Sequence, residues 1–421
     1  MSWGFVEYNT EKKVGDFMII GIVGGGASGM AAAITASQES ENHIILFERQ
    51  ARVGKKLSAT GNGRCNLSNI HACEKGFHGA DGAFSAIALS QHTPEETLAW
   101  FHSLGLFTVT ESSGRVYPYS DQANSVVDVL RFALDKPNIC LRTGFDVSRI
   151  KKTEDGFLVD NGEETVFCHR VIIAAGGLAG TKLGGSMAGY KLLRSLGHHV
   201  TKLRPSLVQL KSSWRGVSSL KGVRAVCDAR ILLDGTEKAR STGEIQFTEY
   251  GLSGPVIFEL SRDVCQENGD WVCVLDFLPG YTEEELYKEL SRRKSSSLNS
   301  DELLTGILHN RLGRVVVQSA RISLSAPIIQ LSMEELYNVC RLVKRFEISV
   351  TEPLGMDSAQ VTAGGICTDE FDPKTMESRL VSGLFACGEV LDVDGDCGGY
   401  NLQWAWSSGR VAGACAGRIV E

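Results

Sequence analysis

Three glycines with a distinctive spacing are the residues of this sequence best suited to bind phosphate. Gly24, Gly26 and Gly29 follow an apolar run, 17–23, and open a segment rich in Ala. This pattern predicts a strand, a tight turn and a helix. The first glycine would permit the turn, the second would let a pyrophosphate approach the backbone, and the third would let the helix pack closely on the strand. The N–H groups at the helix start would then bind the phosphates.

An acidic residue follows at the distance expected of a ribose ligand. Glu48 ends a short apolar segment, 43–47, and stands 19 residues after Gly29. A carboxylate at this place accepts hydrogen bonds from a ribose. The glycines and the acid together predict a βαβ unit that binds a dinucleotide, with a βαβ unit that binds no ligand as the alternative.

A polar loop, 54–69, comes next and should pass over the bound dinucleotide. Lys55, Lys56 and Arg64 stand in it among glycines and asparagines. Such a loop supplies cations and backbone donors to phosphate or to the edge of a flavin ring. A mobile polar loop with no ligand is the alternative.

The C-terminal residues repeat the first theme. A short apolar segment, 384–388, ends at Glu389, and a glycine-rich loop, 392–400, leads into a predicted helix, 401–416. Parallel sheets bind ligands at the carboxyl ends of their strands, so this turn and the first glycine turn can face one cofactor. The predicted cofactor domain is therefore discontinuous, and the apolar run 171–175 would return the chain to its parallel sheet.

The elements between these two ends predict a second domain. Alternating segments, 224–232 and 271–277, are typical of an antiparallel, barrel-like sheet, and the glycine-rich stretch 243–255 is expected to be a loop. Capping boxes predict helices that begin after Thr93, Thr282 and Ser332, and 301–312 is expected to be another helix. Asn161 and Gly162 predict a hairpin.

The predicted fold class is α/β. We expect a discontinuous, three-layer Rossmann-type domain at 17–200 and 355–421, a barrel-like substrate domain at 201–280 and 321–354, and a helical inset at 281–320. The sixteen residues before Phe17 are expected to form an extension outside this core. A chain of 421 residues is too long for one compact core, so two or three lobes are expected from its length.

Composition excludes several classes of protein. The net charge of −7 argues against a nucleic-acid groove, and no apolar run is long enough to span a membrane. The twelve cysteines form no Cys-x-x-Cys pair, which favours reduced thiols and a cytoplasmic setting. The nine histidines form no metal-binding pattern, so no metal is expected.

The combined motifs resemble a flavoprotein family that contains the BaiN-like bile-acid (steroid-type enone) reductases and the aminoacetone oxidases. The resemblance rests on segments 24–29, 61–66, 114–118, 247–254, 362–366 and 398–409. It implies tightly held FAD, redox chemistry and an FAD domain with a barrel and a helical inset. Two positions depart from the family pattern, Glu249 and Cys397, where the family often has His and Thr. These departures leave the substrate open.

The glycine motifs and the resemblance together give a set of expected cofactor-binding residues. The pyrophosphate would lie on the first glycine turn, the adenosine ribose at Glu48, and the adenine against the backbone of Val147. The full expected set is Gly24, Gly26, Ala27, Ser28, Gly29, Glu48, Arg49, Lys55, Lys56, Gly61, Asn62, Arg64, Cys65, Asn66, Val147, Ala175, Gly176, Gly177, Gly365, Gly388, Glu389, Gly399, Asn401 and Leu402.

The predicted reaction is hydride transfer from reduced FAD to the C=C bond of a conjugated ketone. Tyr117 and Tyr400 are the candidate proton donors, because each is expected in a glycine-bearing loop. A structural tyrosine held by one hydrogen bond is the alternative for each. A redox disulfide between Cys65 and Cys397 is disfavoured against buried thiols.

No second Gly-x-Gly-x-x-Gly follows a strand, so NADH or NADPH is expected to dock only transiently as the donor. An oxidase of a small amine such as aminoacetone is the first alternative function. A protein of another class, FAD-containing and RNA-modifying or RNA-binding, is the second. A small-molecule substrate is the expected partner, and the sequence leaves the oligomeric state open.

Overall fold

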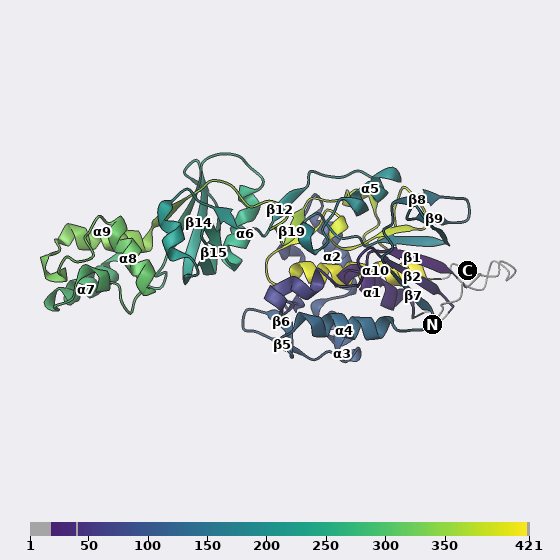
Figure 1. Ribbon diagram of the computed structural model, residues 1–421, viewed down its shortest axis with the longest axis horizontal. Coiled ribbons are helices and arrows are strands. Elements are labelled where there is room, and N and C mark those ends of the chain that lie inside the picture. Colours follow the sequence, from purple (N-terminus) through teal and green to yellow (C-terminus); the bar gives the residue numbers. More distant parts are fainter. Residues whose placement is uncertain (1–17, 39–40, 419–421) are drawn as a thin grey trace. The chain divides into compact units, whose positions relative to one another are not determined.

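The computed structural model describes residues 18–38 and 41–418, which divide into two compact units (Figure 1). Unit 1 comprises the described residues up to Leu203 and those from Ala363 onward, and unit 2 comprises Arg204–Thr362. The sequence analysis placed the corresponding boundaries at 200/201 and 354/355. The predicted extension, 1–16, and Phe17 lie outside the described residues.

Unit 1 is built on a five-stranded parallel sheet with the order β20-β11-β1-β2-β7. The strands are β1 (Ile19–Val23), β2 (His43–Glu48), β7 (Ile139–Thr143), β11 (Arg170–Ile173) and β20 (Leu384–Ala386). β11 pairs with β1, which confirms the predicted return to the sheet. β20 comes from the C-terminal part of the chain and pairs with β11, so the domain is discontinuous, as predicted. The apolar runs follow from burial of a parallel sheet on both faces.

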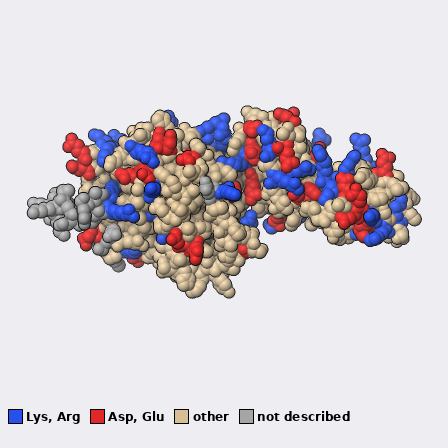
Figure 2. All heavy atoms as spheres, turned by 180° about the vertical axis from the view of Figure 1, so that it is seen from behind, with Lys and Arg blue, Asp and Glu red and all other residues tan. Residues whose placement is uncertain are grey.

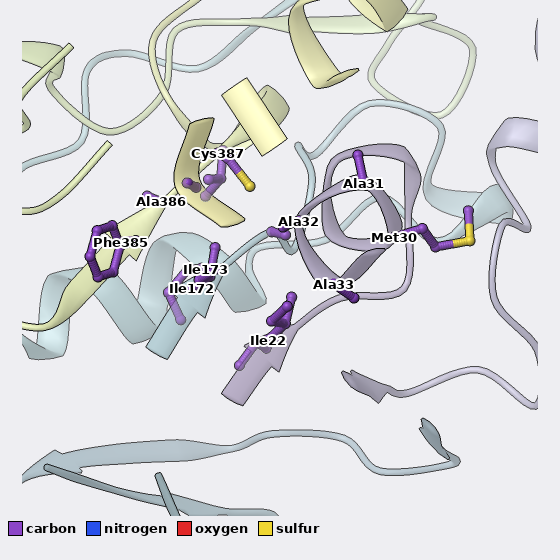
Figure 3. Packing of buried hydrophobic residues seen from close by; sticks show 14 of the residues in the cluster. Ile22, Met30, Ala31, Ala32, Ala33, Ile172, Ile173, Phe385, Ala386 and Cys387 are labelled. Carbon is purple, nitrogen blue, oxygen red and sulfur yellow. The ribbon is translucent and has the colours of Figure 1, made fainter. Parts of the chain in front are cut away.

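Layers cover both faces of this sheet. Helices α1 (Ala27–Ala36) and α10 (Tyr400–Gly417) lie on one face, where Ile22 of β1 points to Ala32 and Ala33 of α1 (Figure 3). On the other face, β10 packs closely against the sheet: a Cβ atom added to Gly21 would lie only 2.7 Å from Sγ of Cys168, at the end of β10. The antiparallel strands there are β8 (Arg149–Lys152), β9 (Phe157–Asp160) and β10 (Thr165–Cys168). The predicted hairpin at Asn161 and Gly162 joins β9 to β10.

The remaining elements of unit 1 are short. Its other helices are α2 (Gly82–Gln91), α3 (Pro94–Ser103), α4 (Ala123–Leu134) and α5 (Ala188–Ser195). Its small sheets pair β3 (Ser68–Asn69), β6 (Arg115–Pro118) and β5 (Thr108–Thr110) in that order, and β21 (Asp394–Gly395) with β4 (Phe77–His78). The predicted capping box at Thr93 begins α3.

Unit 2 contains a six-stranded antiparallel sheet that closes on itself. Its order is β13-β16-β15-β14-β17-β18, and Lys211 of β13 exchanges backbone hydrogen bonds with Thr351 and Glu352, directly after β18. This closure makes the sheet barrel-like, as predicted. The strands are β13 (Leu210–Lys211), β14 (Arg224–Leu233), β15 (Thr236–Phe247), β16 (Gly251–Ser253), β17 (Trp271–Asp276) and β18 (Phe346–Val350), and a separate pair joins β12 (Arg204–Ser206) to β19 (Val361–Ala363).

Four helices complete unit 2. They are α6 (Pro255–Val264), α7 (Glu283–Arg292), α8 (Asn310–Ser319) and α9 (Met333–Lys344). Both predicted capping boxes are present, at Thr282 before α7 and at Ser332 before α9. α9 packs against α7 and α8, although the sequence analysis assigned its residues to the barrel segment.

Two predictions for unit 2 were wrong. The stretch 243–255 is not a loop, since it contains the end of β15, all of β16 and the start of α6. Its glycines permit close strand contact, because a Cβ on Gly251 would lie 1.9 Å from the carbonyl oxygen of Leu210. The helix predicted at 301–312 is also misplaced. Gly306 has a φ of +79° and His309 caps the helix start, so α8 begins only at Asn310.

Glycines also explain how closely α1 and α10 approach. A Cβ on Gly409 would lie 2.4 Å from the carbonyl oxygen of Ser28, and one on Gly413 would lie 2.4 Å from that of Ala32. Gly417, four residues further, faces Ala36 in the same way. This row of glycines positions the two helices whose N-termini begin at the two glycine turns.

We predict that Gly413→Ala lowers the free energy of unfolding by about 2 kcal/mol, because an added methyl group would overpack a buried contact with backbone. Thermal unfolding, followed by circular dichroism, measures the change. Gly82→Ala is the matched control, since no protein atom lies within 4 Å of a Cβ there. Equal stability of both variants would contradict the close packing.

A buried histidine connects two distant segments of unit 1. Nδ1 of His198 lies 2.9 Å from Oε2 of Glu370, and its Nε2 lies 3.0 Å from Oγ of Ser378. The Ser378 hydroxyl oxygen already accepts from the backbone N–H groups of Leu380 and Val381. Its proton is therefore free to be donated to Nε2, which requires a neutral imidazole.

Acid should weaken this network. Burial lowers the pKa of His198 below its ordinary value of 6.5. The neutral imidazole therefore stabilises the fold fully above pH 6.5, and this stabilisation is lost as the pH falls below 6.5. Burial opposes ionisation of Glu370, but hydrogen bonds from both neighbouring histidines outweigh it and lower its pKa below 4.5. The stability that Glu370 contributes is therefore lost only below pH 4.5, and the decline that this network causes between pH 7 and pH 5 comes from the histidine. We predict that the melting temperature falls between pH 7 and pH 5.

The variant His198→Gln tests this source of the pH dependence. It should melt lower than the parent at pH 8 and show a flatter decline between pH 7 and pH 5. Burial also lowers the pKa of His92, to about 4. Because protonation of His92 likewise destabilises the fold, the variant should keep part of the decline in melting temperature. An unchanged slope in the variant would assign the acid sensitivity to other groups.

Candidate cofactor and substrate site

The first glycine turn has the geometry of a phosphate cradle. Gly24 has a φ of +112°, and a Cβ there would lie 2.4 Å from the carbonyl oxygen of Ala174. A Cβ on Gly29 would lie 1.8 Å from the carbonyl oxygen of Gly24, so this glycine lets α1 approach the turn. Gly26 differs from both, because its φ is −82° and no protein atom lies within 4 Å of its Cβ position.

Packing within the chain therefore gives no reason for glycine at position 26. An approaching ligand gives one, since a side chain there would occupy the space in front of the helix start. Gly26 is the N-cap of α1, and its first turn, Ala27 to Gly29, contains no acidic residue. The N–H groups and the positive end of the helix dipole are thus available to a pyrophosphate, and the residues fit this part of FAD.

Glu48 lies at the carboxyl end of β2, beside the turn. Its Oε2 accepts from the N–H of Gly25 at 2.8 Å, and its Oε1 accepts from the N–H of Gln50 at 2.7 Å. Each carboxylate oxygen retains a lone pair for a ribose hydroxyl. The neighbouring Arg49 donates to the carbonyl oxygen of Gly184, which holds its guanidinium close to the same strand end.

The polar loop after β2 is fixed to the C-terminal part of unit 1. Nζ of Lys56 lies 2.7 Å from Oε2 of Glu389 and also donates to the carbonyl oxygen of Ala179. Two expected cofactor residues are therefore brought together as an ion pair from opposite ends of the chain. Lys55, by contrast, contacts Gln50 at 3.5 Å.

A strained bend follows in this loop and leads to Arg64. Gly61 and Asn62 both have a φ of +57°. Arg64 donates to Asp121 at 2.5 Å and to Glu111 at 3.1 Å, and its guanidinium carbon lies 4.0 Å from the centre of the Tyr117 ring. These two hydrogen bonds raise the pKa of Arg64. Its charge is thus balanced by two carboxylates and covers one face of a candidate proton donor.

The two candidate tyrosines do not lie in loops, so the prediction that each stands in a glycine-bearing loop was wrong. Tyr117 belongs to β6 and is 6% exposed, and Tyr400 is the first residue of α10. Burial and the nearby Glu111 raise the pKa of Tyr117, which keeps its hydroxyl protonated at neutral pH. The Tyr400 hydroxyl donates to the carbonyl oxygen of His71 at 3.3 Å.

The second glycine turn opens α10. Gly398 and Gly399 have φ values of +112° and +105°, and the first turn of the helix contains no acidic residue. Asn401 uses its amide to hold the preceding loop, donating to the carbonyl oxygen of Gly395 at 2.7 Å and accepting from its N–H at 2.8 Å. Its backbone, rather than its side chain, is therefore available to a ligand. Leu402 packs against the core of unit 1.

The remaining expected residues also lie in unit 1. Val147 is buried shortly after β7, and Ala175, Gly176 and Gly177 follow β11. Gly388 follows β20 and approaches α1, because a Cβ there would lie 2.4 Å from Oγ of Ser28. Asn66 lies against Gly399 at the start of α10, and a Cβ on Gly365 would lie 2.4 Å from the backbone of Leu391.

The cysteine of the polar loop is unsuited to redox chemistry. Cys65 is fully buried, and burial raises the pKa of its thiol to about 12. A thiol so rarely ionised is a poor nucleophile. None of the twelve cysteines forms a disulfide, and no group of three or more His, Cys, Asp or Glu able to hold a metal occurs among the described residues. Within the same part of the chain, no helix has the length and apolar character needed to cross a membrane.

Sequence reasoning missed three features that hold segments of unit 1 together. The glycine row of α10 repeats every fourth residue, a signal that the printed sequence does contain. The network of His198, Glu370 and Ser378 joins residues about 170 and 180 positions apart, so no local pattern shows it. Gln403 joins Ser407 of its own helix to Ser68 and Thr97, and the last two contacts are equally nonlocal.

The parallel sheet, the two glycine turns and the open position at Gly26 define a Rossmann-type dinucleotide-binding domain. The family and the relatives place the chain among the FAD-dependent oxidoreductases. The family model described as "HI0933-like protein Rossmann domain" matches residues 18–415, and the chain belongs to this family. The chain is similar to the 3-dehydro-bile acid delta(4,6)-reductase of Clostridium scindens, with 38% identity over 94% of this chain and 98% of the relative.

Two further proteins are similar over nearly the whole chain. The ribosomal RNA dihydrouridine synthase of Escherichia coli is 30% identical over 95% of this chain and 97% of its own length. Among solved structures, 3-ketosteroid delta1-dehydrogenase from Sterolibacterium denitrificans matches with a TM-score of 0.51 and 11% identity, over 96% of this chain and 99% of that one. At this identity the structural match shows the fold alone.

Proposed function

We propose that this protein uses FAD to reduce a C=C bond conjugated to a carbonyl group in a small molecule with a steroid-type or bile-acid-type ring system. NADH or NADPH is the proposed transient electron donor, and the cytoplasm is the proposed setting. The observation that carries the proposal is the likeness to the bile-acid reductase over 94% of the chain. The open cradle at Gly26 supports the cofactor independently of that likeness.

The residues proposed to hold FAD come from both ends of the chain. Gly24, Gly26 and the N-terminus of α1 would bind the pyrophosphate, and Glu48 would bind the adenosine ribose. The N-terminus of α10, which begins after Gly399, would lie at the flavin end. When bound, FAD supplies a group that accepts a hydride from a nicotinamide and donates it to an electron-poor carbon.

The chain itself would supply the proton and the electrostatic field. Tyr117 holds a phenolic proton at neutral pH, because burial raises its pKa. A positioned general acid of this kind can protonate the carbon next to the carbonyl as the double bond is reduced. The positive end of the α10 dipole would stabilise negative charge that develops beside it.

A second candidate substrate is uridine in RNA. Relatives in E. coli and Haemophilus influenzae carry the name ribosomal RNA dihydrouridine synthase, and a uracil ring also has a C=C bond conjugated to a carbonyl. The charge distribution does not favour it. Positive and negative side chains are interspersed over the face shown in Figure 2, and the net charge is −7.

Anaerobic mixing tests these proposals in one series. The purified yellow protein is mixed with NADH or NADPH, and the flavin absorbance is followed. The reduced protein is then mixed with 4-androstene-3,17-dione, with a uridine-containing ribosomal RNA fragment, or with buffer. We expect bleaching by a nicotinamide and reoxidation by the steroid enone. Bleaching by aminoacetone alone would instead support an amine oxidase, and reoxidation by the RNA alone would support uridine reduction.

A further inference from the structure

One face of the β5–β6 hairpin carries a row of large side chains that begins at Tyr117. Val109 pairs with Tyr117 across the two strands, and the N–H of Tyr119 donates to the carbonyl oxygen of Phe107 at 2.8 Å. Residues two apart on a strand share a face, as do residues paired across strands. Phe107, Val109, Tyr117 and Tyr119 therefore form one surface, here called the aromatic stripe.

The outer part of the aromatic stripe is open to solvent. Tyr119 is 75% exposed, Phe107 66% and Val109 43%, whereas Tyr117 is buried. Exposed apolar groups that stand together mark a binding surface more often than single exposed residues do. Phe107 also contacts His102 edge to face, with ring centroids 5.1 Å apart, so its ring is held in place.

The inner end of the stripe lies at the candidate site. A Cβ on Gly61 would lie 3.6 Å from Cε1 of Tyr117, and Arg64 covers the ring of Tyr117. Arg115 stands two residues before Tyr117 in β6 and therefore lies on the same face. A Cβ added to Gly398, in the turn before α10, would lie 2.9 Å from Nε of Arg115. The stripe thus leads from solvent to the second glycine turn.

The charges beside the stripe select the kind of ligand. Arg64 is neutralised by Glu111 and Asp121. RNA is a polyanion and binds where cations outnumber carboxylates. The charged side chains that the structure describes beside the aromatic stripe show no such excess of cations. A flat, uncharged ring system fits both the aromatic groups and the balanced charge.

We propose that the aromatic stripe binds the rings of a flat, multi-ring enone, with Phe107 and Tyr119 contacting the rings distant from the reacting double bond. This inference rests on the proposed function, which it deepens by assigning the residues that select large ring systems. A small enone with a single ring would reach the inner site without covering the outer stripe.

The double variant Phe107→Ser, Tyr119→Ser tests the proposal in the FAD-loaded protein. The probes are 4-androstene-3,17-dione and 2-cyclohexen-1-one. We expect kcat/KM to fall about 30-fold for the steroid and at least ten times less for cyclohexenone, because the lost contacts touch only the larger molecule. Phe132→Ser is the control, since Phe132 is 73% exposed in the last turn of α4, outside the stripe.

The outcomes separate this proposal from the proposed function. Equal losses for the two enones, or no loss for the steroid, would overturn the role of the stripe while leaving enone reduction in place. Loss of RNA reduction in the double variant, with steroid reduction unchanged, would assign the stripe to nucleobases and overturn our choice of ligand. If the parent protein reduces neither enone, the proposed function itself fails.

Discussion

Gly26→Val should yield a folded protein that purifies without yellow colour. A branched side chain at this position would fill the space in front of α1, where no protein atom lies within 4 Å of the Cβ. It would therefore exclude a pyrophosphate without disturbing the packing of the chain. We expect FAD affinity to fall at least about 100-fold, which corresponds to roughly 2.7 kcal/mol.

Two measurements test this prediction separately. Titration of the stripped protein with FAD, followed by quenching of flavin fluorescence, gives the affinity, and thermal unfolding without FAD gives the stability. Gly82→Val is the matched control, because its Cβ position is equally open and lies outside the proposed site. If Gly26→Val kept its colour and its FAD affinity, the first glycine turn would not hold the cofactor.

The parts of the fold that the sequence predicts are those that depend on local spacing. Gly24, Gly26 and Gly29 stand within six residues and predict the turn and α1 directly. The capping boxes at Thr93, Thr282 and Ser332 likewise predict helix starts, because each cap is made by a side chain three residues away. In these cases the residues that interact are neighbours in the chain.

The parts that the sequence did not predict depend on contacts between distant residues. Gly251 suggested a loop, but β13 approaches it so closely that only glycine fits within the sheet. Lys56 and Glu389 were each expected at the cofactor, yet their ion pair spans 333 positions. Tyr117 was assigned to a loop because a glycine stands close before it, whereas its strand, β6, has only four residues and pairs with strands of two and three.

Tyr117→Phe should slow the reoxidation of the reduced flavin by an enone about 100-fold, the usual contribution of a positioned general acid. Flavin reduction by the nicotinamide should stay within about twofold, because that step needs no proton from the chain. Since burial raises the pKa of Tyr117, the parent rate should be constant from pH 6 to 9 and fall only in stronger alkali. The variant should lose that alkaline decline.

Tyr400→Phe is the internal comparison for this prediction. Its hydroxyl donates to a backbone carbonyl, and its ring packs beside Phe77 with centroids 5.6 Å apart, so we expect a change of less than about fivefold. Stopped-flow reoxidation of both variants by 4-androstene-3,17-dione makes the comparison. A large loss in Tyr400→Phe alone would move the proton donor to the start of α10. Unchanged rates in both variants would remove both tyrosines from proton transfer, and the proton would then have to come from solvent or from another residue.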